Sequence, residues 1–258
     1  MIEMIPIHVG GELVEAMVAR PDLAAADPVP LTGVLFYMDA FGLRPRIGEM
    51  AQRIANWGYV VMAPNVFHRA GTVAETSPDG PLTDPGAREA FFGSLRPRLD
   101  DLFSAERRPE LLDDLRAYVD TLHQLEGVSH RPIGITGYCM GARLAVLTAG
   151  LMGDGVAAVG GFHGGGLVTD DADSPHLALA TAKAEFVFGH ADNDRSNTPE
   201  QMASLDQAMT DEGLAHHSSV YEGAPHGYSM ADTSAFHPEA TERHFRELRE
   251  LLDSTLKG

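Results

Sequence analysis

Short apolar runs alternate with segments of helical periodicity along most of the chain. Uninterrupted apolar runs such as Gly33–Met38 are typical of strands that are buried on both faces of a parallel sheet. Strands are predicted over residues 33–38, 59–63, 133–138, 156–162, 184–188 and 217–221. Helices are predicted over residues 47–56, 84–95, 110–125 and 142–151, from residue 198, and over 238–252. This alternation predicts an α/β fold with a mainly parallel, doubly wound sheet.

Three stretches depart from this alternation. Residues 3–9 and 12–18 alternate in polarity around Gly10-Gly11, which predicts an antiparallel hairpin at one edge of the sheet. Residues 21–30 are rich in Pro, Ala and Asp and are expected to form a surface loop. Residues 64–110 are the least regular. We expect them to contain one helix, to wrap over the sheet and to shape the substrate pocket.

Composition narrows the class of protein. The 258 residues, 44% of them hydrophobic, suit one domain spanning 1–258. A net charge of −18 argues against nucleic acid and anionic lipid as partners. A single cysteine permits no intramolecular disulfide. The sequence has neither a signal-peptide pattern nor an apolar run long enough to span a membrane, so we expect a cytoplasmic enzyme.

The pattern Gly137-x-Cys139-x-Gly141 stands between the predicted strand 133–138 and the predicted helix 142–151. A strand, a sharp turn with a nucleophile at its tip and a helix together form the nucleophile elbow of α/β-hydrolases, here with cysteine in place of serine. Glycines are expected on either side because a β-carbon would crowd the strand or the helix. The turn would hold the Cys139 sulfur at the carboxyl end of the sheet, where the amide of Met140 can face an oxyanion.

Two further candidates follow later strands, and the carboxyl ends of parallel strands meet at one edge of the sheet. Asp192 follows the strand 184–188, and His226 lies in a Pro/Gly turn after the last strand. The order Cys139, Asp192, His226 is that of the α/β-hydrolase triad. His226 would act as the base, and Asp192 would fix its tautomer. Asp194 is the alternative acid. We favour Asp192 because of its position in the turn.

The loop after the strand 33–38 reads Asp39-Ala40-Phe41-Gly42. In an α/β-hydrolase the second amide of the oxyanion hole comes from this loop, so we assign it to Ala40, paired with Met140. We expect Asp39 to lie near Cys139, where its carboxylate would hydrogen-bond the thiol and keep the sulfur protonated until substrate arrives.

Four segments resemble the dienelactone hydrolase (carboxymethylenebutenolidase) family of α/β-hydrolases. They are Gly137–Ala142, Gly189–Asp192, Pro225–Tyr228 and Phe41-Gly42. Because they are spread over most of the chain in the order of the family, the resemblance implies the whole fold. It also implies a Cys-Asp-His triad that hydrolyses a small lactone or carboxylic ester through an acyl-enzyme on Cys139, without metal or other cofactor.

The chain departs from the family pattern at two kinds of position. It has Asp39 in place of the glutamate that the resemblance implies before the oxyanion-hole amide, and Met230 in place of one of the two arginines that would bind a substrate carboxylate. The nearest match to a second family arginine is Arg88, with Phe92 and Leu95 at the aromatic positions. A larger or less charged substrate than dienelactone is therefore expected. The pocket candidates are Phe41, Arg88, Tyr138 and His163, and for His163 a structural role is an equal alternative.

Other functions remain open. The same triad suits a thioesterase or an acyltransferase, and a hydrolase fold can also serve as a non-catalytic binding protein. A metal hydrolase is a weaker alternative, with ligands drawn from His216-His217 or from His190, Asp192 and Asp194. Adjacent strand residues point to opposite faces, which disfavours the histidine pair. We expect a monomer or a small homo-oligomer.

Overall fold

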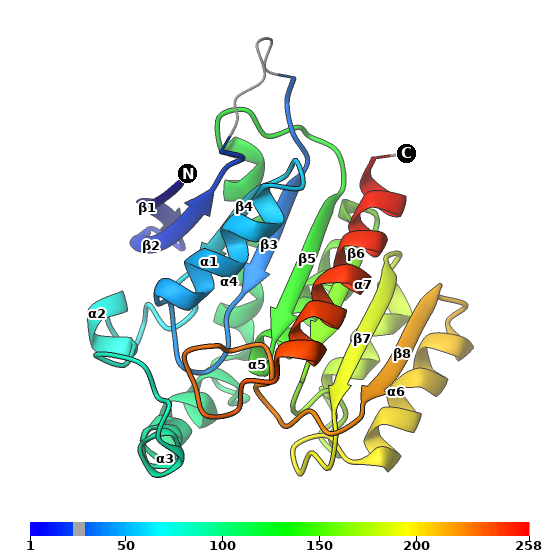
Figure 1. Cartoon of the computed structure of the whole chain (residues 1–258). Helices are drawn as coiled ribbons and strands as arrows, with labels where there is room; N and C mark the ends of the chain where they lie inside the picture. Colours follow the sequence, from blue (N-terminus) through cyan, green and yellow to red (C-terminus); the bar gives the residue numbers. More distant parts are fainter. Residues whose placement is uncertain (23–28, 258) are drawn as a thin grey trace.

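The computed structural model describes residues 1–22 and 29–257, so most of the loop predicted over 21–30 lies outside the described residues. Eight strands form one mixed sheet in the order β1-β2-β4-β3-β5-β6-β7-β8 (Figure 1). The strands are β1 (Ile2–Val9), β2 (Glu12–Ala19), β3 (Gly33–Tyr37), β4 (Val60–Pro64), β5 (Ile133–Tyr138), β6 (Val156–Phe162), β7 (Glu185–Ala191) and β8 (His216–Tyr221).

The amino-terminal hairpin forms as predicted. Strands β1 and β2 pair antiparallel, and Gly10 and Gly11 adopt positive φ angles of 56° and 87° in the turn between them. Both values suit glycine because it has no Cβ. Strand β2 also runs antiparallel to β4, whereas the pairs from β3 to β8 are parallel. The hairpin thus forms one edge of a mainly parallel sheet.

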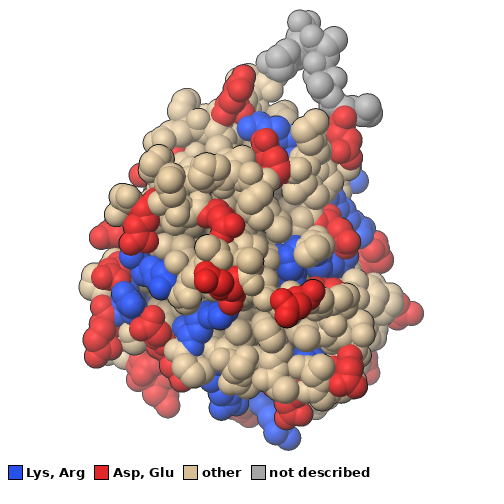
Figure 2. All heavy atoms as spheres, turned by 90° about the vertical axis from the view of Figure 1, so that its left-hand side faces the viewer, with Lys and Arg blue, Asp and Glu red and all other residues tan. Residues whose placement is uncertain are grey.

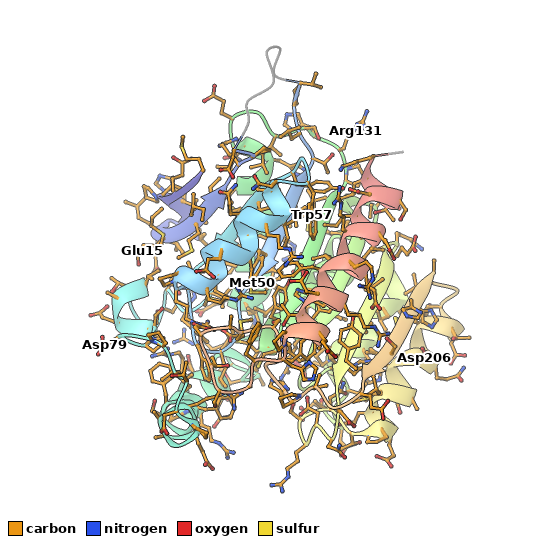
Figure 3. The ribbon with its side chains drawn as sticks, viewed as in Figure 1. Glu15, Met50, Trp57, Asp79, Arg131 and Asp206 are labelled. Atoms are coloured by element: carbon orange, nitrogen blue, oxygen red, sulfur yellow. The ribbon has the colours of Figure 1, made fainter. Side chains whose placement is uncertain are left out.

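Helices cover both faces of the sheet. Helices α1 (Pro45–Ala55) and α7 (Pro238–Leu256) lie on the face toward the viewer, and α4 (Arg108–Gln124), α5 (Met140–Met152) and α6 (Pro199–Asp211) lie behind it (Figure 1). Trp57 follows α1 and packs edge-on against Phe245 of α7, with ring centroids 6.0 Å apart (Figure 3). The prediction of a doubly wound sheet is therefore confirmed. No described helix is long and apolar enough to cross a membrane.

Residues 64–110 contain more helix than the sequence predicts. Besides the short α2 (Val73–Thr76), helix α3 spans Pro85–Leu102, seven residues beyond the predicted end at residue 95. The apolar periodicity of α3 is weak because Leu95 is its only buried residue among those described.

Acidic and basic side chains are interspersed over the face of the molecule that carries α2 and α3, without a patch of one sign (Figure 2).

The turn from β5 into α5 depends on the close approach of two backbones. A β-carbon built on Gly137 would lie 2.1 Å from the carbonyl oxygen of Gly141. One built on Gly141 would lie 2.4 Å from the carbonyl oxygen of Tyr37 on β3. Neither contact can be relieved by a side-chain rotation, because both partners are backbone atoms. The two glycines therefore allow the first turn of α5 to pack directly on the sheet.

Replacing Gly141 by alanine should lower the free energy of unfolding by about 3 kcal/mol, because α5 has to move away from β3. Chemical denaturation measured by circular dichroism would show it. Gly93 is the matched control: it lies within α3, and a β-carbon there meets nothing within 4 Å. Gly93→Ala should raise stability by about 0.5–1 kcal/mol. Equal responses of the two variants would contradict this account of the turn.

Candidate active site

Three non-glycine residues in the described part of the chain have positive φ angles, and each follows a strand of the parallel sheet. Cys139 follows β5 with φ 56°, His163 follows β6 with φ 39°, and Asn193 lies just after β7 with φ 53°. Such angles cost free energy for residues with a Cβ, and they concentrate at functional sites. The strain thus marks the carboxyl edge of the sheet, where the sequence places the candidate residues.

His226 is held at this edge by a carboxylate. Its Nδ1 atom lies 2.6 Å from Oδ2 of Asp194, and the Asp194 side chain is only 4% exposed. Burial opposes a charge on the His226 ring, but the nearby Cys139 sulfur and the Asp194 carboxylate outweigh it and raise the pKa of His226 to about 10. Because Nδ1 is engaged by Asp194, Nε2 remains for the thiol.

The preference for Asp192 as the partner of His226 is therefore wrong. Oδ2 of Asp192 accepts a hydrogen bond from the amide of Gly223 at 2.9 Å, and the Asp192 amide donates to the carbonyl of Ala224 at 2.8 Å. Asp192 thus joins the turn after β7 to the turn after β8, which carries His226. The left-handed conformation of Asn193 then redirects the chain, so that the side chain facing His226 is that of Asp194.

Ser196 supports this pair and was not identified from the sequence. Its hydroxyl donates to Oδ1 of Asp194 at 2.7 Å, its amide donates to the same atom at 2.8 Å, and its Oγ lies 3.2 Å from Nδ1 of His226. Burial raises the pKa of Asp194, but the hydrogen bonds from His226 and Ser196 lower it below its usual value overall. The Asp-x-Ser spacing, which favours a local side-chain-to-amide turn, was the available signal.

Asp39 does not serve the thiol in the way expected. Its carboxylate forms two hydrogen bonds with the guanidinium of Arg44 and accepts one from the amide of Phe41. Arg44, itself buried, also binds Asp232. Asp39 is thus committed to a buried ion-pair network that fixes the loop after β3. No local pattern indicates the role of Arg44, because its partners lie 5 and 188 residues away.

The amides assigned to an oxyanion hole are available for that role. Neither the amide of Ala40 nor that of Met140 donates to an acceptor among the described residues. Met140 begins α5, so its amide belongs to the unpaired first turn of a helix, where negative charge is favoured. Both residues adjoin elements that meet at Gly141, and the two amides remain candidates for binding an oxyanion.

Phe41 and Arg88 lie together near His226. Arg88, on α3, donates to the carbonyl of His226 at 3.1 Å, and its guanidinium lies 5.7 Å from the centre of the Phe41 ring. The Phe41 ring also packs edge-on against Phe91 of α3, with centroids 5.6 Å apart. Helix α3 therefore reaches the turn that carries His226.

Tyr138 belongs to the core, which corrects its assignment to the pocket. It is fully buried, its ring stacks on Phe36 and Phe162, and its hydroxyl lies 3.2 Å from Nε2 of His244 on α7. A side chain enclosed in this way cannot contact a substrate.

His163 is also fully buried, but it touches the candidate site. Its Nε2 lies 2.8 Å from Oγ of Ser229, and its ring packs edge-on against that of His226, with centroids 5.4 Å apart. Burial, with a contribution from the charge on His226, lowers the pKa of His163 well below its usual value. A neutral His163 therefore supports the His226 ring, in line with the structural alternative.

The side chains considered as metal ligands point to separate partners. His190 is engaged by Ser218 and Asn197, and His216 by the carbonyl of Leu214 and by Asp206. Among residues 1–22 and 29–257, no group of three or more His, Cys, Asp or Glu side chains is arranged to hold a metal ion.

Known proteins resemble the chain over nearly its whole length. A carboxymethylenebutenolidase of Rhodococcus opacus is 28% identical over 229 residues, which cover 84% of this chain and 82% of the relative. A dienelactone hydrolase-like promiscuous phosphotriesterase from metagenomic libraries has a similar structure, with a TM-score of 0.80, 17% identity and coverage of 99% of this chain and 98% of its own. A dienelactone hydrolase of Anabaena variabilis has a TM-score of 0.68 at 17% identity, with the same coverage.

The structural neighbours establish the fold alone, because their identities are low. The family follows from the sequence. A sequence model described as "Dienelactone hydrolase family" matches residues 14–256, which include most of β2, the whole of β3 to β8 and every residue of the candidate site. With the α/β-hydrolase sheet and the arrangement of Cys139, Asp194 and His226, this match shows that the chain belongs to the dienelactone hydrolase family, a family of hydrolases.

Proposed function

We propose that the protein hydrolyses a small carboxylic ester or lactone through an acyl-enzyme on Cys139, with His226 as acid and base and Asp194 as the carboxylate of the triad. The observation that carries the proposal is the hydrogen bond of 2.6 Å between Asp194 and Nδ1 of His226, with the Cys139 sulfur acting on the same ring. Membership in a hydrolase family supports the reaction class.

In the first half-reaction the thiol proton resides on Nε2 of His226, and the Cys139 sulfur attacks the carbonyl carbon. The carbonyl oxygen becomes an oxyanion, and the amides of Ala40 and Met140 are the proposed donors to it. When the tetrahedral intermediate collapses, the bond between carbon and the leaving oxygen breaks. His226 returns its proton to that oxygen, which leaves as an alcohol, or stays attached to the acyl chain when the substrate is a lactone.

The second half-reaction repeats these steps with water. His226 removes a proton from a water molecule, the resulting hydroxide attacks the thioester, and the acid is released as the proton returns to the sulfur. Asp194 stabilises the imidazolium in both halves and keeps Nδ1 protonated, so that Nε2 faces the reacting atoms. Ser196 holds the Asp194 carboxylate in place through two hydrogen bonds to Oδ1.

A direct test uses p-nitrophenyl acetate and small lactones, with and without iodoacetamide and EDTA. Turnover should be lost on alkylation of Cys139, the only cysteine, and should persist in EDTA. Cys139→Ala should abolish turnover while the circular dichroism spectrum stays that of the wild type. Turnover by Cys139→Ala would sink the thiol mechanism. Absence of turnover by the wild type on every ester would favour a binding protein.

Two aspartates only two residues apart offer a matched comparison. Asp194→Asn should lower kcat on the order of 10³-fold, because the imidazolium loses its partner and the wrong tautomer becomes accessible. Asp192→Asn removes the same charge but leaves that hydrogen bond, so kcat should fall less than about 10-fold and the main effect should be on stability. Steady-state kinetics with p-nitrophenyl acetate decide between them, and a larger loss for Asp192→Asn would reverse the assignment.

The pH dependence follows from the raised pKa of His226, from an ordinary 6.5 to about 10. The charged His226 ring, paired with the Asp194 carboxylate, stabilises the fold fully below about pH 6.5, and this contribution is lost as pH rises through about 10. The alkaline limb of the kcat/KM profile should therefore lie near pH 10, since imidazolium must donate to the leaving oxygen. In Asp194→Asn the limb should move to lower pH, and an unmoved limb would contradict the pairing.

A further inference from the structure

Arg143 lies in the first turn of α5, four residues after Cys139, which immediately precedes the helix. Side chains on a helix slope toward its amino terminus, which directs Arg143 toward the end that carries Cys139. A β-carbon built on Gly166 would lie 3.6 Å from Nη1 of Arg143, and one on the preceding Gly165 would lie 3.7 Å from Cε1 of His226. The guanidinium is thus on the order of 10 Å from the His226 ring, given ~3.8 Å between consecutive Cα atoms.

This guanidinium has no anionic partner among the residues that the structure describes. Its Nε atom is shielded from solvent and lacks an acceptor. The ring of Phe103, just after α3, covers one face of the group, with 4.0 Å between Cζ and the ring centre. Burial and the nearby charge of Arg108 lower the pKa of Arg143 from its usual value, although the charges of Asp173 and Asp171 act in the opposite direction.

The two carboxylates whose charges act on Arg143 form no ion pair with it, and each has another partner. Asp173 lies 3.5 Å from Nη1 of Arg108, and Asp171 accepts a hydrogen bond of 3.0 Å from the hydroxyl of Thr169. A shortage of acids does not explain the unpaired cation, because the chain has 37 acidic and 19 basic residues. A half-buried guanidinium without acceptors costs free energy, which an anion bound at this position would recover.

We propose that Arg143 binds a carboxylate of the substrate, several bonds away from the scissile carbonyl. The inference rests on the proposed ester or lactone hydrolysis and adds the charge of the substrate to it. A planar guanidinium suits a carboxylate because it can donate two parallel hydrogen bonds, and the Phe103 ring restricts its orientation. Arg143 selects the substrate and does not touch the reacting atoms. Because Met230 stands in place of an arginine, the sequence predicts a less charged substrate. A carboxylate bound at Arg143 replaces that expectation.

The experiment compares kcat/KM for two p-nitrophenyl esters of similar length, the mono-ester of glutaric acid and the neutral ester of pentanoic acid. The wild type should prefer the anionic ester, and added salt should weaken the preference. Arg143→Gln should lower kcat/KM for the anionic ester on the order of 10- to 100-fold, the range of a charged hydrogen-bonded pair, and leave the neutral ester within about 2-fold. Arg143→Lys should recover part of the loss.

Arg98 provides the matched control. It also lies over an aromatic ring, that of Phe67 at 5.0 Å, and among the described residues it donates to the carbonyl of Thr76. Arg98→Gln changes the net charge by the same amount, and it should leave the preference between the two esters intact. An equal loss on both esters in Arg143→Gln, no loss on either, or the same change in Arg98→Gln would overturn the inference.

A binding measurement separates failure of this inference from failure of the proposed function. Calorimetric titration of Cys139→Ala with glutarate requires no turnover. Glutarate should bind, and Arg143→Gln introduced into Cys139→Ala should weaken it on the order of 10- to 100-fold. Binding that depends on Arg143 in a protein without esterase activity would disprove the hydrolytic function alone. Glutarate binding that is absent, or independent of Arg143, would disprove the carboxylate site.

Discussion

The close packing of α5 on the sheet is the constraint on which the candidate site depends. With glycine at 137 and 141, the first turn of the helix reaches the backbone of β3, where any β-carbon would collide with carbonyl oxygens. This contact turns the chain sharply at Cys139, in a conformation that its side chain disfavours. The sulfur is thereby held at the carboxyl edge of the sheet, beside unpaired helical amides and within reach of His226.

The neighbouring strand ends complete this arrangement through further local strain and polar contacts. Asn193 has a positive φ and directs Asp194 toward His226, while Asp192 fastens the two turns together through Gly223. His163, also strained, supports the His226 ring from the buried side. Asn193 and His163 keep these strained conformations because of their neighbours. The geometry of the Asp194–His226 pair therefore depends on contacts between three strand ends.

Buried charges near the site fall into three groups. Asp39, Arg44 and Asp232 neutralise one another and fix the loop that carries Ala40. Asp194 and the Cys139 sulfur both act on His226 and stabilise its charged form. Arg143 stands apart, since no described residue accepts a hydrogen bond from it or forms an ion pair with it. Two of the groups therefore hold the loop after β3 and the His226 ring in place, and the third suggests the charge of the proposed substrate.

The sequence by itself determined the sheet, the hairpin edge and the elbow, because apolar runs, Gly-Gly and the glycines around Cys139 act over a few residues. It also identified Cys139 and His226, which stand at strand ends in a characteristic order. Only the tertiary structure decided between Asp192 and Asp194, placed Tyr138 in the core, gave Asp39 to Arg44 and left Arg143 unpaired. These outcomes depend on side-chain directions after a turn and on partners as far as 188 residues apart, which no local pattern encodes.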